Sequence, residues 1–138
     1  MTIERFEDLE CWKEARILVN MVYDAINSSN KFRGDYQLRN QITDAAVSSM
    51  SNIAEGFSRH TNREFIQYLF ISKSSATEVQ SEAYVALDQK YISQETFENL
   101  YNQAEKVSRL DSGLISYLLK NEKRFKKNKA AHQTQETQ

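Results

Sequence analysis

The stretch Ala45–Arg59, which reads AAVSSMSNIAEGFSR, decides the fold of this chain. Small or apolar residues recur in it at the three- and four-residue spacing of one helix face. They are Ala46, Ser49, Ile53, Gly56 and Phe57. Small side chains on that face allow the backbone of a second helix to approach closely. Asn52 and Glu55 lie beside it and are expected either to be solvated or to reach a partner. The stretch therefore predicts a helix that packs tightly against a neighbour.

Helical periodicity extends over most of the chain, which has no proline and three glycines. The pattern predicts helices over about 9–26, 36–57, 62–90 and 94–125, with N-caps at Asp8, Thr61 and Ser93. The polar segment 27–35 is predicted to be the first loop, anchored by Phe32. Gly113 is expected either to bend the last helix or to admit a neighbour closely.

Four amphipathic helices with short connections favour an all-α fold, an antiparallel up-down-up-down four-helix bundle. We predict an N-terminal arm over 1–8, the bundle over 9–126 and a disordered polar tail over 127–138. One stripe of apolar residues on each helix is expected to form the core. Its predicted members include Trp12, Ile53, Phe65, Leu69, Val79, Leu100 and Leu114.

Composition and charge indicate the cellular compartment and the kinds of partner to expect. The single cysteine, Cys11, cannot form an internal disulfide, and we expect it to be a small buried group in a cytoplasmic protein. No apolar run is long enough to cross a membrane. The net charge of −1 predicts no general attraction to nucleic acid. The charge is uneven, however, because residues 1–119 carry a balance of −5 and residues 120–138 one of +4.

Few residues in the sequence have the type and spacing that catalysis or metal binding requires. We therefore predict no catalytic site, no metal site and no cofactor. His60 and His132 fall in a predicted loop and in the predicted tail, so neither joins a metal or triad arrangement. The glycines are too far apart for a phosphate-binding loop. Glu55 is the one residue that could serve as a general base, and helix-surface polarity or an interface role explains it more simply.

Three segments resemble the family of 23S ribosomal RNA intervening-sequence proteins. They read FEDLECW over 6–12, AAVSSMSNIAEGFSR over 45–59 and REFIQYLFISKSSATE over 63–78, within a resemblance that spans about residues 6–118. The resemblance implies a four-helix bundle that assembles into a ring, a pentamer, and a bacterial, non-enzymatic protein. The family is related to accessory proteins of diversity-generating retroelements, which bind nucleic acid and a reverse transcriptase.

The resemblance and the charge pattern lead to two hypotheses about function. In the first, the protein binds RNA or an RNA-handling protein through basic residues near the end of the last helix, which are Lys120, Lys123, Arg124, Lys126 and Lys127. In the second, it is a scaffold that binds only protein. The polar residues of the family motif are Asn52, Glu55 and Arg59. A basic pair often seen before the double alanine is Thr43-Asp44 here, which weakens the first hypothesis.

The second and third helices carry more apolar residues than one inward stripe requires. Such an excess on one small chain predicts burial between subunits, so we expect a homo-oligomer. The residues expected at this interface are Met50, Phe57, Ile66, Phe70 and Ile71.

Overall fold

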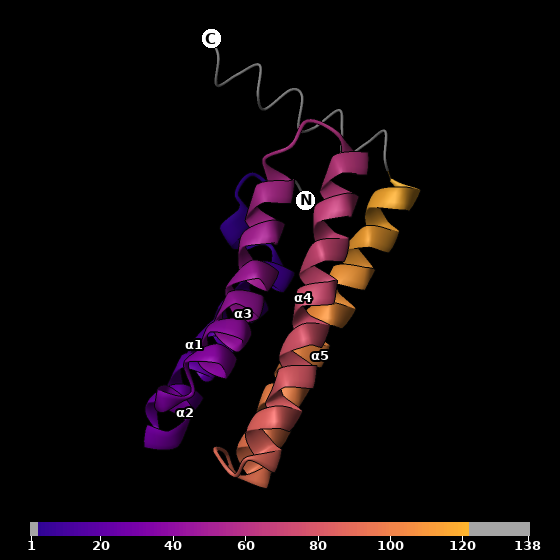
Figure 1. Ribbon diagram of the computed structural model, residues 1–138. Helices are drawn as coiled ribbons and strands as arrows, with labels where there is room; N and C mark the ends of the chain where they lie inside the picture. Colours follow the sequence, from indigo (N-terminus) through magenta and orange to yellow (C-terminus); the bar gives the residue numbers. More distant parts are fainter. Residues whose placement is uncertain (1–2, 122–138) are drawn as a thin grey trace.

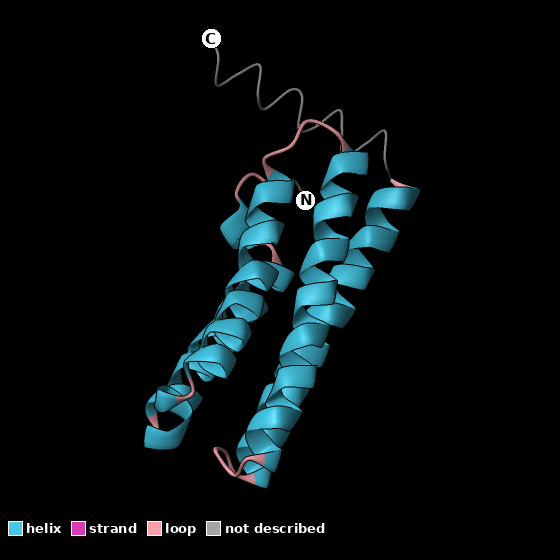
Figure 2. Cartoon of the chain, in the orientation of Figure 1, coloured by secondary structure: helices cyan, strands magenta, loops and turns pink. Residues whose placement is uncertain are grey.

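Helices form nearly all of the structure that the computed structural model describes, which covers residues 3–121. They are η1 (Phe6–Asp8), α1 (Glu10–Asn27), α2 (Asn30–Gly34), α3 (Tyr36–Phe57), α4 (Asn62–Asp88) and α5 (Gln94–Lys120). Figure 2 shows them joined by short loops, and no strand occurs within the described range. The predicted bounds of α3 are confirmed. The predicted tail over 127–138 lies outside the described residues.

Side-chain caps start three of the four long helices. The side chain of Asp35 accepts a hydrogen bond from the Leu38 amide at 3.1 Å, and Thr61 and Ser93 cap α4 and α5 in the same way. The prediction that Asp8 caps the first helix is wrong, because Leu9 is the N-cap and no side chain caps α1. Asp8 is instead wound into η1, whose Phe6 packs edge-on against Trp12.

The predicted first loop contains a short helix, α2. The Ser29 hydroxyl accepts a hydrogen bond from the Phe32 amide at 3.2 Å and so caps α2. Phe32 is fully buried and stacks on Tyr91, with ring centroids 5.4 Å apart. Phe32 therefore anchors this connection, as the sequence predicted. Its burial holds α2 against the end of the bundle where α4 joins α5.

The four long helices form an up-down-up-down bundle (Figure 1). Helix α3 packs against α1 and α4, and α5 packs against α4 and α1, so each helix lies next to its neighbours in a closed ring of four. The connection between α3 and α4 lies at one end of the bundle, and the connection between α4 and α5 lies at the other (Figure 1). None of the helices within residues 3–121 combines the length and the apolar character needed to cross a membrane.

The core largely follows the predicted stripes. The fully or almost fully buried residues include Ile53, Phe65, Leu69, Val79 and Leu100, as predicted. Two other predicted core residues, Trp12 and Leu114, are only partly buried and pack against the edge of the core. On α1 the buried line runs through Cys11, Ala15, Leu18, Val22, Ala25 and Ile26. Tyr23, the residue after Val22, is 45% exposed although it is apolar.

Candidate interaction surfaces and the buried polar layer

The polar residues of the motif in α3 form contacts on the surface between α3 and α4. Asn52 donates hydrogen bonds to the Ser48 carbonyl and hydroxyl, each at 2.9 Å. The Ser48 hydroxyl lies 2.9 Å from that of Ser75 on α4. Asn52 and Ser48 thus extend a hydrogen-bonded chain from α3 to α4.

Arg59 makes a second link between these helices. Its guanidinium forms an ion pair with the Glu55 carboxylate, one turn earlier, at 3.3 Å. The same guanidinium donates a hydrogen bond to the Tyr68 hydroxyl and stands over the Tyr68 ring at 4.8 Å from its centroid. These contacts give Glu55 and Arg59 a role in joining α3 to α4.

The predicted interface residues differ in exposure. Phe70 and Ile71 on α4 are 52% and 47% exposed, whereas Met50, Phe57 and Ile66 are half-buried against the core. Helix periodicity places Phe70 on the α5 side of α4, on one line with Gln80 and Tyr84, which contact α5. Ile71 falls on the α3 side. The exposed apolar side chains therefore lie on both flanks of the outer face of α4.

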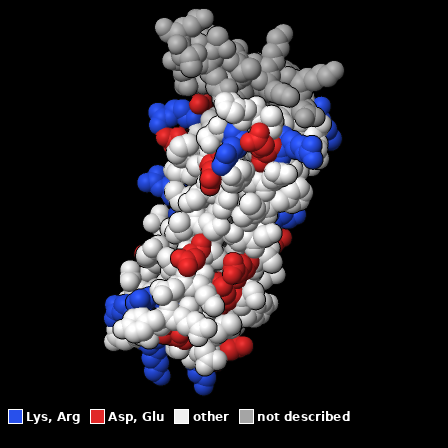
Figure 3. Space-filling view, turned by 45° about the horizontal axis from the view of Figure 1, so that its top comes forward, with Lys and Arg blue, Asp and Glu red and all other residues white. Residues whose placement is uncertain are grey.

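The predicted basic cluster is described only at its first residue. Lys120 is exposed at the end of α5, and Lys123, Arg124, Lys126 and Lys127 lie outside the described residues. The connection between α3 and α4 comes to the same end, since Asn62 donates a hydrogen bond to the Leu118 carbonyl at 3.4 Å. Figure 3 shows lysines and arginines interspersed with acidic residues at this end.

The sequence analysis did not place Arg63 at the same end of the bundle as Lys120. An up-down-up-down bundle puts the second long connection and the end of the last helix at one end of the molecule. That rule alone would have placed exposed Arg63, next to Asn62, near Lys120. The described basic residues at this end are therefore more numerous than Lys120 alone.

A buried polar layer crosses the middle of the bundle and takes one residue from each long helix. Its members are Cys11 of α1, Ser49 of α3, Ser72 of α4 and Asp111 of α5. The Ser72 hydroxyl lies 2.7 Å from the Ser49 backbone carbonyl oxygen and 2.7 Å from Oδ2 of Asp111. Asp111 is fully buried, and its Oδ1 has no hydrogen-bond partner among the described residues.

Burial controls the ionisation of the layer. It raises the pKa of Asp111 to about 7, although Ser72, Cys11 and Lys73 each favour the carboxylate. Burial, with the adjacent Asp111, also raises the pKa of the Cys11 thiol well above its ordinary range. Such a thiol is a poor nucleophile, which fits the prediction of a small buried group.

The helical spacing of residues in α5 could have indicated that Asp111 is buried. Residues 97, 100, 104, 107, 111, 115 and 118 follow the spacing of one helix face, and all of them are buried. Leu110 and the predicted core residue Leu114 are apolar but only half-buried, and Tyr117 is 44% exposed. An apolar pattern does not indicate position 111, because its residue is an aspartate and aspartates are seldom fully buried.

A second perturbed carboxyl lies between α3 and α4. Burial, together with the neighbouring Glu78 and Asp44 carboxylates, raises the pKa of Glu82 to about 7. Like charges on neighbouring turns favour a shared proton at this position. Within residues 3–121 no group of three or more His, Cys, Asp or Glu side chains could hold a metal ion.

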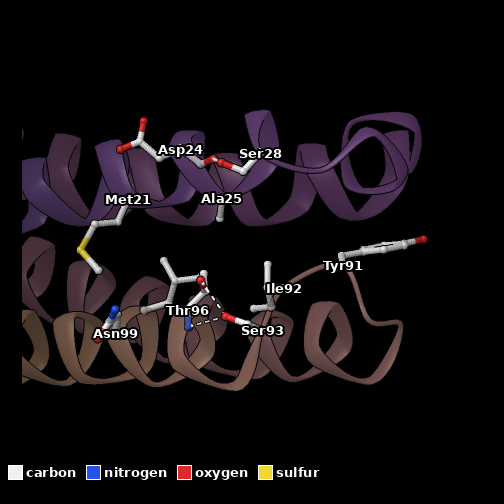
Figure 4. A pocket seen from close by; sticks show the side chains of 10 residues that line it. Met21, Asp24, Ala25, Ser28, Tyr91, Ile92, Ser93, Thr96 and Asn99 are labelled. Carbon is white, nitrogen blue, oxygen red and sulfur yellow. Dashed lines mark hydrogen bonds between the residues drawn. The ribbon is translucent and has the colours of Figure 1, made fainter.

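A pocket of about 380 Å³ opens between α1 and the start of α5 (Figure 4). It is lined by Met21, Asp24, Ala25, Ser28, Tyr91, Ile92, Ser93, Thr96, Asn99 and Leu100. Several of its polar groups are already used. Ser93 caps α5, Ser28 donates to the Asp24 carbonyl, and Tyr91 donates to Asp35 outside the pocket. This arrangement provides packing and helix caps, with no nucleophile and base brought together.

The fold and these contacts define a class of protein, the all-α four-helix bundle with hydrogen bonds between the side chains of its helices. Within that class, the chain belongs to the 23S rRNA-intervening sequence protein family, whose model matches residues 7–113. This match confirms the resemblance seen in the three sequence segments.

A solved structure has the same fold. It is a protein of unknown function from the S23 ribosomal protein family of Bacteroides thetaiotaomicron, with a TM-score of 0.64 and 22% sequence identity. The match covers 76% of this chain and 94% of the other. No curated protein matches the chain. At this identity the likeness establishes the fold alone.

Proposed function

We propose that this protein is a non-enzymatic, self-assembling bundle that acts in the cytoplasm and binds RNA or an RNA-handling protein. The observation that carries the proposal is the exposure of large apolar side chains on the outer face of α4, where Phe70 is 52% and Ile71 is 47% exposed. Apolar side chains gathered in this way are typical of surfaces that contact other proteins. A second copy of the chain is the simplest partner, and the family resemblance favours five copies in a ring.

The RNA part of the proposal rests on the family and on the basic end of the bundle. The family is named for an intervening sequence of 23S rRNA. Exposed Lys120 and Arg63 lie at the end of the bundle where the chain continues into Lys123, Arg124, Lys126 and Lys127. Positive side chains in such numbers neutralise RNA phosphates and release counterions. Ring assembly would repeat the basic end once per subunit and so raise the avidity for a long RNA.

A salt titration tests this proposal. The full chain is mixed with an RNA hairpin taken from a 23S rRNA intervening sequence, and the dissociation constant is measured over a series of salt concentrations. Binding through phosphates must weaken linearly on a log–log plot, with a slope of about −0.7 to −0.9 per contacted phosphate. Replacing Lys123, Arg124, Lys126 and Lys127 by Gln should weaken binding and flatten the slope.

A matched control comes from the opposite end of the bundle. Lys31 and Lys90 are exposed there, and replacing both by Gln removes positive charge without changing the proposed contact surface. This variant should bind RNA as the wild type does. An absence of RNA binding at low salt would reject the RNA part and leave the alternative function, a scaffold that binds only protein. A hairpin of unrelated sequence reports whether the binding is selective.

A further inference from the structure

The hydroxyl of Ser72 faces two acceptors with a single proton. Its Oγ lies 2.7 Å from the Ser49 backbone carbonyl oxygen and 2.7 Å from Oδ2 of Asp111. A serine hydroxyl donates one hydrogen bond. If Asp111 were ionised, one of the two contacts would hold two oxygen lone pairs at 2.7 Å with no proton between them. Neither orientation of the Ser72 hydroxyl satisfies both contacts around an ionised Asp111.

A proton on Asp111 removes this conflict. The carboxyl then donates to Ser72 Oγ, and Ser72 donates to the Ser49 carbonyl, which gives a continuous chain from α5 through α4 to α3. We propose that this layer is a proton-operated latch, in which protonated Asp111 ties α5 to α3 through Ser72 and loss of the proton at higher pH loosens the bundle. Buried hydrogen-bond chains of this kind stabilise a fold only when every member is satisfied.

The groups around Asp111 set the pH range over which Asp111 loses its proton. From α1 the titratable neighbour is Cys11, and from α4 it is the half-buried Lys73, whose positive charge favours the carboxylate. Ser49 of α3 reaches the layer through Ser72 and does not titrate. Oδ1 of Asp111 has no hydrogen-bond partner in its fully buried position, and the nearby Cys11 thiol is only a weak donor, so a negative charge on Asp111 would be poorly compensated. Burial outweighs Lys73, so the pKa of Asp111 rises to about 7.

The direction of the pH effect follows from this shift. In the unfolded chain Asp111 loses its proton near the ordinary pKa of 3.8, and in the folded bundle it does so near 7. Between these values the unfolded chain binds fewer protons, so each unit of rising pH favours unfolding by up to about tenfold. Below the lower value both states are protonated, and above the higher value both are ionised. The latch therefore loses strength from about pH 4 to about pH 7.

Urea unfolding of the full chain between about pH 5 and about pH 8 tests the latch. Asp111→Asn keeps a donor towards Ser72 at every pH and cannot ionise. We expect the unfolding equilibrium constant of the wild type to rise more steeply with pH than that of Asp111→Asn, with a difference approaching tenfold per unit up to about pH 7. All proteins are compared at one concentration, so that assembly contributes equally. Equal pH dependence in the two proteins would overturn the proposal.

The matched control is Glu82→Gln, which removes the other carboxyl whose pKa is raised to about 7. This variant should keep the share of the pH dependence that Asp111 contributes. A direct measurement covers the case in which Asp111→Asn does not fold. The infrared carbonyl band of a protonated carboxyl should persist in Glu82→Gln near pH 6 and disappear as the pH is raised through about 7. Absence of that band near pH 6 would show that Asp111 is ionised and that the latch does not exist.

Discussion

Gly56 sets how closely α3 can approach α4. A Cβ atom at this position would lie 2.6 Å from the Cβ of Tyr68 and 3.0 Å from a ring carbon of Phe65. Both neighbours are held in place, Tyr68 by Arg59 and Phe65 by full burial. We predict that Gly56→Ala lowers the free energy of unfolding by about 1–2 kcal/mol, because the overpacking exceeds the gain in helix propensity. Urea unfolding measures the change.

Gly113 is the control for this substitution. It also lies within a long helix, and no atom outside its own backbone surroundings comes within 4 Å of a Cβ built there. The expectation that it could admit a close neighbour is therefore wrong. Gly113→Ala should raise the free energy of unfolding by about 0.5–1 kcal/mol. The role assigned to Gly56 fails if both alanine variants are equally stable.

Single residues show where a pattern of apolar side chains misleads. Ile53, Phe65 and Leu69 were assigned correctly because each is apolar and also at a core spacing. Asp111 has the core spacing without the apolar side chain, and Tyr23 is apolar but exposed. Sequence spacing could have nominated Asp111. Its partner Ser72 comes from another helix, and the alignment of two helices along their axes is set by packing that the sequence does not display.

Among the elements, α4 ends in an arrangement that its sequence does not favour. Lys90 follows the helix with φ of 63°. Its amide donates to the Leu87 carbonyl at 2.9 Å, and the Tyr91 amide donates to the Ala86 carbonyl at 2.9 Å. This pair of bonds is the Schellman motif, which usually has glycine at the position of Lys90. A side chain there costs about 1–2 kcal/mol in the left-handed conformation.

We therefore predict that Lys90→Gly raises the free energy of unfolding by up to about 1 kcal/mol, since relief of the strained backbone exceeds the entropy that glycine adds to the unfolded chain. Lys90→Ala is the matched control, because it removes the same charge and keeps the strain. Thermal or urea unfolding compares the two. A Lys90→Ala variant as stable as Lys90→Gly would mean that the lysine side chain, and not its backbone, limits stability.

The elements that the sequence missed are short. Helices α3 and α4 each begin directly after a residue whose side chain caps the helix. The cap of α4, Thr61, is recognisable in the sequence. Helix α2 and the turn η1 span five and three residues. Segments of that length have too few positions for a periodic pattern, and they depend on packing, as the burial of Phe32 shows. Asp8 looked like a cap because η1 could not be predicted.

At the scale of the whole molecule, the order of four amphipathic helices and short connections was enough to predict the bundle. The interaction surfaces were harder to predict. Exposure of Phe70 and Ile71 followed from an excess of apolar residues, whereas the half-burial of Met50 depends on neighbouring helices. The up-down-up-down topology brings Lys120 and Arg63 to the same end of the bundle. The other basic residues predicted to act there lie outside the described residues. The number of subunits in an assembly does not follow from the apolar pattern of a single chain.

The last prediction concerns assembly through the outer face of α4. Phe70→Glu places a charge at a position that is 52% exposed in the single bundle, so the fold should survive. In a contact between copies, the same charge would be buried without a partner, which is strongly unfavourable. We expect native mass spectrometry and light scattering to show a defined oligomer for the wild type at micromolar concentration and smaller species for Phe70→Glu. Asn20→Glu adds the same charge at an exposed position on α1, which packs against α3 and α5 across the bundle from α4, and it should keep the wild-type mass. A monomeric wild type would leave Phe70 exposed in solution, and self-assembly through α4 would have to be abandoned.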